Sequence, residues 1–245
     1  MLEATIDASL LKDSIESLSV LVDEARVHIS PEGIGVKAVD PANVAMVSFE
    51  LQADAFDEYQ AEESEIGLDL TRVLDILGVA EKTDKVKMRL EEDSRKLSIS
   101  IGGISYTLTL LDPSTIRAEP RIPQLELPAE IVVNGKGFSR TVKAAEKISD
   151  HMSMGVEGEI FFLEAEGDTD RMRQEMPRDE LISITPAPVR SLFSLDYLSD
   201  IIKPASKSNE VTLQIGNDFP IKINFEIAGG RGKVGYLLAP RIESE

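Results

Sequence analysis

The sequence predicts an α+β protein made of two similar domains of mostly antiparallel sheet. Three observations lead to this prediction. Alternating apolar and polar residues fill much of the 245-residue chain, only four segments have helical periodicity, and the pattern of the first half recurs in the second. Because few helices are available to cross over between parallel strands, the sheets should be antiparallel.

Four helices are expected, each with one apolar face. Asp69 and Ser194 stand at N-cap positions of the second and fourth helices, and Asn134 lies just ahead of the third. The helices are predicted at residues 9–22, 70–79, 136–149 and 194–203.

The strands are expected where apolar residues alternate and turn residues bound the run. Clear examples lie at residues 85–90, 96–101, 106–110 and 220–227. Turns are expected at residues 30–33, 102–103 and 228–230, where Gly and Pro gather. Strands should therefore outnumber helices.

An internal repeat relates the two halves at an offset of 125 to 127 residues. The matching apolar segments are 11–18 with 138–145, 70–77 with 195–202, and 86–90 with 211–215. Four prolines lie between residues 113 and 128, and they favour an extended connector. We therefore predict an N-terminal domain at 1–112, a connector at 113–127 and a C-terminal domain at 128–245.

The charge is strongly negative, with 44 acidic against 26 basic residues and a net charge of −18. Taken alone, this charge argues against a nucleic-acid-binding protein. Both halves are acidic, so the coat suits a salt-rich cytosol in which self-repulsion is screened. An acidic protein of ordinary cytosol is the alternative. Neither a signal peptide nor an apolar run long enough to span a membrane is evident, and a cytoplasmic protein is expected.

The residues for common catalytic and metal sites are sparse. The chain has no Cys and two histidines, His28 and His151. No G-x-S-x-G, H-E-x-x-H, EF-hand or G-x-G-x-x-G motif is present. We predict no catalytic residue, no metal site and no cofactor.

The third predicted helix carries a basic stripe, which consists of Lys136, Arg140, Lys143 and Lys147. Their spacing of i, i+4, i+7 and i+11 places them on the side opposite the apolar face. Solvated helix faces usually mix charges, and this chain has few bases. The basic stripe therefore predicts a surface that faces an anion.

Several segments resemble one family. They are LAPRIESE at the C-terminus, AVDPANVAMVSFEL at 38–51, and FDEYQ with GLDLTRVLDIL between 56 and 77. The chain resembles, over its whole length, proliferating cell nuclear antigen (PCNA), the sliding clamp of archaea and eukaryotes. Its acidic coat suggests a halophilic archaeon as the source.

The resemblance implies a non-enzymatic processivity factor. Three identical subunits would close a ring, with helices lining the hole, around double-stranded DNA of any sequence. DNA polymerase, clamp loader, flap endonuclease and DNA ligase would bind through glutamine-led peptide motifs. Asp13 and Asp75 stand where relatives commonly place lysines, so enclosure should hold DNA more than attraction does.

The resemblance also assigns site residues. The DNA-facing residues would be Lys12, Arg72, Arg140, Lys143, Lys147 and Lys203, with Lys136 added from helical geometry. The partner-binding residues would be Val39, Asn43, Val44, Met46, Ile122, Pro123, Leu125, Leu127, Pro220, Leu237, Leu238, Ala239, Pro240, Arg241 and Ile242. The subunit interface would contain Ser105, Thr107, Thr109, Leu111, Asp170, Arg171, Arg173 and Glu175, with an ionic contribution.

Two other hypotheses stay open on the sequence. One is an acidic halophilic α+β enzyme without a recognisable motif, although this hypothesis explains neither the repeat nor the basic stripe. The other is one subunit of a hetero-oligomeric clamp, which would share the fold.

Overall fold

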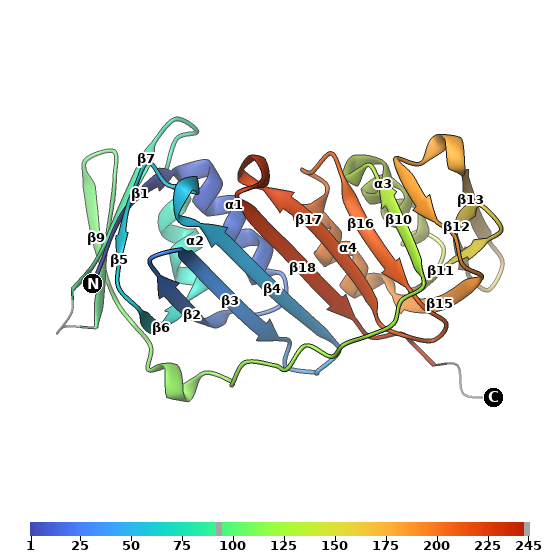
Figure 1. The fold of residues 1–245 in the computed structure, drawn as a ribbon, viewed down its shortest axis with the longest axis horizontal. Coiled ribbons are helices and arrows are strands. Elements are labelled where there is room, and N and C mark those ends of the chain that lie inside the picture. The colour runs from blue at the N-terminus through green and yellow to red at the C-terminus, as the bar shows by residue number, and fades with distance from the viewer. Residues whose placement is uncertain (92–94, 243–245) are drawn as a thin grey trace. The chain divides into compact units, whose positions relative to one another are not determined.

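The computed structural model describes residues 1–91 and 95–242 and divides the chain into two compact units (Figure 1). The first unit comprises residues 1–121 and 226–234, and the second comprises 122–225 and the residues from 235 onward. These limits differ from the predicted 112 and 128, because the first part of the connector packs within the first unit. Each unit is described by itself below.

The first unit contains two antiparallel sheets and two helices. One sheet has the strand order β5-β1-β7-β8-β9, and β4-β3-β2-β6 run side by side in another. The elements are β1 (Leu2–Asp7), α1 (Ala8–Ser19), β2 (Glu24–Ser30), β3 (Gly33–Val39), β4 (Ala45–Gln52), β5 (Glu58–Ala61), β6 (Ser64–Asp69), α2 (Leu70–Leu77), β7 (Lys85–Glu91), β8 (Lys96–Ile101) and β9 (Ile104–Thr109).

The second unit repeats this plan. Strands β14-β10-β16-β17 run side by side, and β13-β12-β11-β15 form a separate four-stranded sheet. The elements are β10 (Ala129–Val133), α3 (Gly135–Ala145), β11 (His151–Glu157), β12 (Ile160–Glu166), β13 (Arg171–Pro177), β14 (Ser183–Thr185), β15 (Val189–Ser194), α4 (Leu195–Ala205), β16 (Val211–Ile215), β17 (Ile221–Ile227) and β18 (Gly232–Leu238), of which residues 226–234, at the end of β17 and the start of β18, belong to the first unit.

The element order confirms the predicted fold class and the internal repeat. In the described residues, each half contains nine strands and two helices in the same order, so β4 corresponds to β13 and β9 to β18. The repeated apolar positions are buried in both halves, at 11, 15 and 18 on α1 and at 138, 142 and 145 on α3. The helices pair within each unit, α1 with α2 and α3 with α4. No helix in the described part of the chain is long and apolar enough to cross a membrane.

The predicted helix starts agree with the structure better than the predicted ends. The Asp69 side chain accepts a hydrogen bond from the Arg72 amide at 2.8 Å, and Asn134 caps α3 through the Gly137 amide at 3.1 Å. Ser194 precedes α4 but makes no side-chain cap bond. Helix α3 ends at Ala145, so Lys147 lies beyond it.

The turn between β8 and β9 makes β9 an edge strand. Gly102 and Gly103 have φ values of +56° and +86°, the region that glycine enters without strain. The chain therefore reverses in two residues, and β9 pairs with β8 throughout its length. In the sheet order, β9 has no neighbour on its other side.

A buried carboxylate joins three strands of the second unit. The Glu164 side chain on β12 is 5% exposed and accepts hydrogen bonds from Arg171 at 2.6 Å and Arg173 at 2.8 Å. The Arg190 guanidinium lies 3.8 Å from the same carboxylate, and Arg173 stacks on the Phe162 ring at 4.3 Å. Burial alone would raise the pKa of Glu164, but hydrogen bonds from Arg173 and Arg171 outweigh burial and lower it.

We predict that Glu164→Gln destabilises the second unit. The substitution keeps the shape but removes the charge that two arginines share, and the loss should be about 1–3 kcal/mol above pH 5. Because the pKa of Glu164 is lower in the folded state, its stabilisation is present above the unfolded-state value and disappears as the pH falls through the folded-state value. Urea unfolding across pH measures both effects.

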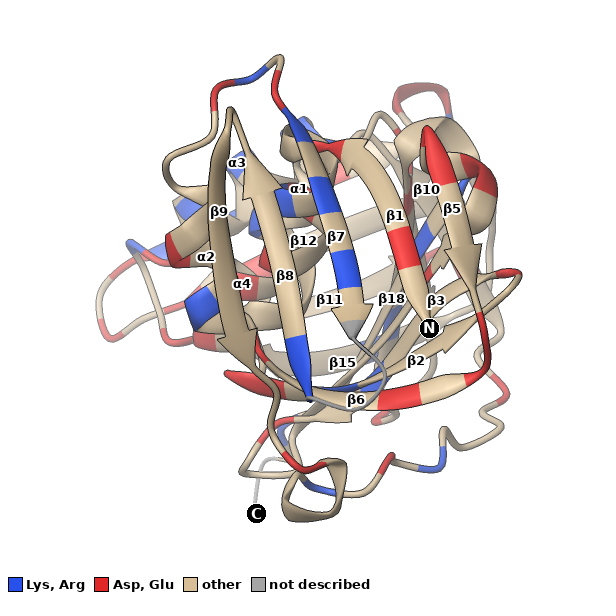
Figure 2. Ribbon diagram, turned by 90° about the vertical axis from the view of Figure 1, so that its left-hand side faces the viewer, with Lys and Arg blue, Asp and Glu red and all other residues tan. Residues whose placement is uncertain are grey.

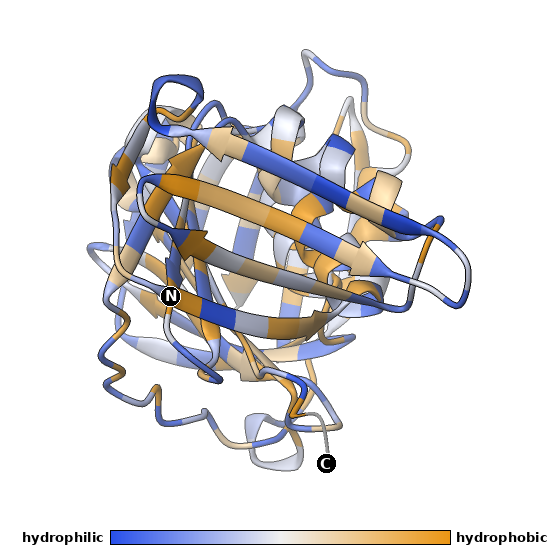
Figure 3. Cartoon of the chain, turned by 90° about the vertical axis from the view of Figure 1, so that its right-hand side faces the viewer, coloured by the Kyte–Doolittle hydropathy of each residue, from blue (hydrophilic) through white to orange (hydrophobic). Residues whose placement is uncertain are grey.

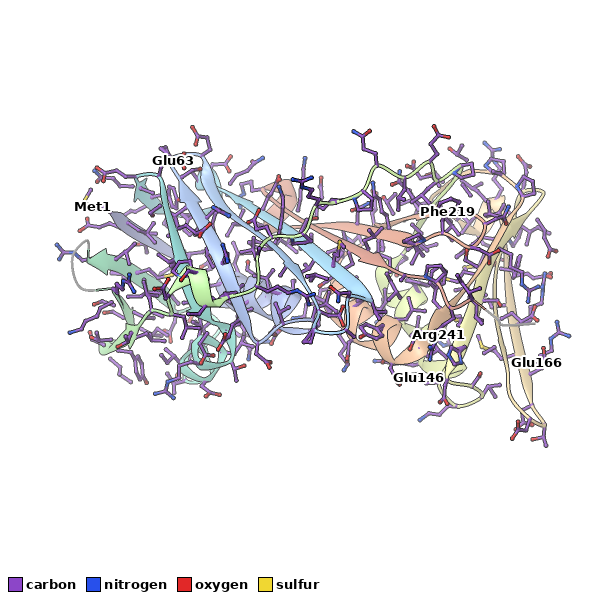
Figure 4. The ribbon with its side chains drawn as sticks, turned by 90° about the horizontal axis from the view of Figure 1, so that it is seen from below. Met1, Glu63, Glu146, Glu166, Phe219 and Arg241 are labelled. Atoms are coloured by element: carbon purple, nitrogen blue, oxygen red, sulfur yellow. The ribbon has the colours of Figure 1, made fainter. Side chains whose placement is uncertain are left out.

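The matched control is Glu166→Gln, two residues along β12 at an exposed position (Figure 4). This variant should unfold like the wild type. Equal stability of the Glu164→Gln variant and the wild type at pH 7 would contradict the assigned role.

Candidate functional site

The basic stripe lies on an exposed face. Lys136, Arg140 and Lys143 project from α3, and Lys147 follows its last turn. Within the described residues, none of the four forms an ion pair. The opposite face of α3 is buried, so folding leaves these charges toward solvent. The stripe is therefore an uncompensated positive surface in a protein of net charge −18.

Basic residues on β7 provide a contrast. Figure 2 shows Lys and Arg bands along β7 beside Asp and Glu bands on β1. Lys85 lies 2.8 Å from Asp7 and 2.7 Å from Asp57, and Arg89 lies 3.2 Å from Glu3. Neighbouring acids compensate these cations, whereas the basic stripe is available to an external anion.

The other predicted DNA-facing residues contribute less positive charge to the surface. Lys12 is exposed on α1. Arg72 lies 4.0 Å from Asp75, and Lys203 lies 2.7 Å from Asp200. Each of these two cations is partly neutralised on its own helix. The positive charge of the candidate surface is thus concentrated at α3.

The partner-binding residues of the first unit gather at the turn between β3 and β4. Val39 ends β3, Asn43 and Val44 lie in the turn, and Met46 is the second residue of β4. The turn is built around Asp40, which is 3% exposed and whose carboxylate accepts amide hydrogen bonds from residues 42, 44 and 45 at 2.7–3.0 Å. No local sequence pattern indicated this role for Asp40.

The first part of the connector is fixed to the first unit by side chains. Arg26 donates two hydrogen bonds to the Ile116 carbonyl at 2.6 and 3.1 Å, and His28 lies 2.5 Å from Glu119. Arg117 donates to the Asp40 carbonyl at 2.9 Å. Sequence reasoning missed these contacts. The one feature of the sequence that could have indicated them is Arg117, an arginine inside the proline-rich connector.

The partner-binding residues of the second unit differ in exposure. Ile122 is 42% and Ile242 79% exposed, whereas Leu237 and Leu238 are buried. Leu238 is 0% exposed, so its assignment to an accessible binding surface is wrong for this structure. It alternates inward with Val234 and Tyr236 on β18 and belongs to the core. A Leu238→Asp substitution would bury a charge and destabilise the fold.

The remaining residues of this set lie at intermediate or exposed positions. They are Pro123, Leu125, Leu127, Pro220, Ala239, Pro240 and Arg241. Arg241 (Figure 4) is held by its amide, which donates to the Leu192 carbonyl at 2.7 Å, and by its Nε, 3.0 Å from His151 Nε2.

The predicted subunit-contact residues lie on two strands at sheet edges. Ser105, Thr107 and Thr109 are exposed along β9, the last strand of its sheet. Strand β13 is likewise the last strand of its sheet and pairs with β12. Leu111 departs from the prediction, because it lies beyond β9 and its amide donates to the Gly67 carbonyl at 3.0 Å.

The charged residues of β13 are engaged within the unit. Arg171 and Arg173 bind Glu164, and Glu175 lies 2.8 Å from Arg173. Asp170 precedes β13 and accepts the Gly167 amide with its carbonyl at 2.9 Å. Figure 3 shows this edge strand as mostly hydrophilic, with hydrophobic bands between. The expectation of an ionic interface is therefore weakened, since the side chains have partners already.

A cavity of about 290 Å³ lies beside the β9 edge. Leu68, Ile76, Tyr106 and Leu108 supply its apolar lining. Its position beside an unpaired strand makes it available to apolar side chains from another chain. Among the described residues, no group of three or more His, Asp or Glu side chains could hold a metal ion.

Comparisons with known proteins cover almost the whole chain. Residues 1–103 match the model of the PCNA N-terminal domain, and residues 121–241 match that of the C-terminal domain. The chain is similar to the DNA polymerase sliding clamps of Methanococcoides burtonii, at 73% identity, and Methanosarcina acetivorans, at 64%, each over 100% of both chains. Both organisms are methanogens, so these matches do not support a halophilic source.

Solved structures agree with these relatives. The structure of A. fulgidus PCNA bound to the C-terminal region of FEN-1 matches with a TM-score of 0.95 and 42% identity over 100% of both chains. PCNA from Thermococcus kodakaraensis matches with a TM-score of 0.91 and 28% identity over 98% of this chain and 100% of that one. The chain belongs to the proliferating cell nuclear antigen family of DNA polymerase sliding clamps.

Proposed function

We propose that three copies of this chain close a ring around duplex DNA in the cytoplasm and tether polymerases and other replication proteins to it. The single observation that carries this proposal is that β9 and β13 each end a sheet and, among the described residues, have no strand on their outer edge. Exposed edges are pairing surfaces that proteins cover or use. The proposed clamp catalyses no reaction itself.

The repeat supplies the partner of each edge. In the first unit, the amide of Gln52, at the end of β4, donates to the carbonyl of Arg231, just before β18, at 2.9 Å. Strand β13 corresponds to β4, and β9 corresponds to β18. The same pairing made between subunits would join β13 of one to β9 of the next.

This correspondence also gives a register. Matching the strands by their alternating burial sets the inward Val234 of β18 against Tyr106 of β9, an offset of 128 residues, and the inward Leu51 of β4 against Met176 of β13, an offset of 125. Transferring the register of the first unit then sets Ser105 opposite Glu175 of the next subunit. Met176, Gln174 and Met172 would face Ile104, Tyr106 and Leu108, beside the cavity.

The DNA contact is proposed to be weak and independent of sequence. The basic stripe supplies positive charge, while Arg72 and Lys203 are partly neutralised. Phosphate contacts of this kind release counterions and weaken steeply with salt. A closed ring keeps its DNA by topology, so a weak lining is compatible with both retention and sliding.

We predict that clamps loaded on closed circular DNA remain much longer than clamps on linear DNA of the same length. The ring can slide off an open end but must itself open to leave a circle. Cutting the loaded circle once with a restriction enzyme should release the clamp, and gel filtration measures the retained fraction. Equal loss from the circle and the linear duplex would contradict enclosure.

Peptide tethering is proposed for the apolar partner-binding residues that remain accessible. The solved A. fulgidus relative is bound to the C-terminal region of FEN-1. We extend this binding mode to polymerase, clamp loader and ligase, with glutamine-led motifs. Burial of aromatic side chains would supply most of the binding free energy.

We predict that Ile242→Asp weakens binding of a FEN-1 C-terminal peptide at least tenfold while the ring still assembles. Ile242 is 79% exposed, so the substitution changes the surface without burying a charge. Calorimetric titration measures the affinity, and light scattering measures the mass. Ile182→Asp, at a 51% exposed position, is the control and should bind normally. Unchanged affinity of the Ile242→Asp variant would refute this site.

A further inference from the structure

Arg117 brings the connector and the turn between β3 and β4 together. Its guanidinium donates one hydrogen bond to the Asp40 carbonyl at 2.9 Å and another to the Asn43 Oδ1 atom. Arg117 and Asn43 are exposed, so both remain within reach of a binding partner. The contact lies wholly within the first unit.

The backbone on which Asn43 stands is held in place. The Asp40 carboxylate accepts the amides of residues 42, 44 and 45, and the Asn43 amide donates to the Asp40 carbonyl at 3.1 Å. Asn43 itself has φ of 59°, a left-handed conformation that asparagine tolerates better than most residues. The backbone at Asn43 is thus fixed, and the Asn43 side chain can change only by rotation about its own bonds.

The chemistry of arginine determines how the Asn43 amide is oriented. A guanidinium has five donors and no acceptor, so it binds the oxygen of the amide and not the nitrogen. The Asn43 Nδ2 atom then has two N–H groups to offer. Within the described residues it makes no hydrogen bond.

We infer that Arg117 is a positioning residue that makes Asn43 a hydrogen-bond donor to peptide partners. The matching group on the partner is an acceptor, such as a backbone carbonyl or a side-chain amide oxygen. This inference rests on the proposed peptide tethering. It specifies that, at Asn43, the clamp donates the hydrogen bond and the peptide accepts it. A partner that presents an N–H group there meets the wrong end of the amide.

Loss of Arg117 releases the amide. The Asn43 side chain can then rotate and present its oxygen as well as its nitrogen, so part of the population has the wrong polarity. A hydrogen bond between neutral groups contributes enough for its loss to weaken binding about three- to tenfold. The Asn43→Ala variant should therefore show this full loss, and the Arg117→Ala variant a smaller loss, set by the fraction of Asn43 side chains that still present the nitrogen.

The test measures affinity for a fluorescent FEN-1 C-terminal peptide by polarisation on assembled rings. The variants are Asn43→Ala, Arg117→Ala, their combination, and Asn43→Asp. The combination should bind no more weakly than the weaker single variant, because Arg117 acts through Asn43. Asn43→Asp keeps an oxygen for Arg117 but lacks the N–H donors, so it should also lose affinity.

Arg121→Ala is the matched control, since it removes the same charge from the same exposed connector segment. It should bind like the wild type. Additive losses in the double variant, or full affinity of Asn43→Asp, would overturn the inference. Failure of the wild type to bind the peptide would instead overturn the proposed tethering, so the two failures are distinguishable.

Discussion

The open backbone edges of β9 and β13 are the constraint on which the proposed ring depends. A two-glycine turn sends β9 back along β8 and leaves the outer edge of β9 open. Strand β13 ends the separate four-stranded sheet of the second unit. Because both halves of the repeat contain the same strands, each open edge would find its complement in another copy of the chain. The proposed assembly would repeat between subunits a pairing that the chain already makes once within itself.

Enclosure of DNA in a closed ring would make a strongly negative net charge compatible with DNA binding. A net charge of −18 is unfavourable for a protein that must attract DNA, but a closed ring has little need of attraction. Folding places the basic stripe of α3 in solvent and compensates cations such as Lys85 and Arg173 with neighbouring acids. Charge elsewhere serves solubility and internal packing, and the basic stripe of α3 is the surface proposed to face phosphate.

Local patterns predicted much of this structure, and tertiary contacts explain what they missed. Helical periodicity and cap residues such as Asp69 located the helices, since both depend on near neighbours in sequence. Leu238 and Glu164 depend on distant strands: alternation alone could not distinguish the core from a binding surface, nor foresee a buried carboxylate between arginines. Arg117 was missed for the same reason, because its partners lie more than seventy residues away.

Disulfide cross-linking tests the edge-to-edge ring most directly, because the chain has no native cysteine. The proposed register makes Ser105 and Glu175 of adjacent subunits a hydrogen-bonded pair, whose Cα separation of about 5.5 Å suits a disulfide. Mild oxidation of the Ser105→Cys, Glu175→Cys variant should yield covalent dimers and then trimers, whereas Ser105→Cys with Gln174→Cys, on opposite faces, should not cross-link. Absence of covalent species, or chains longer than three, would contradict the closed trimer.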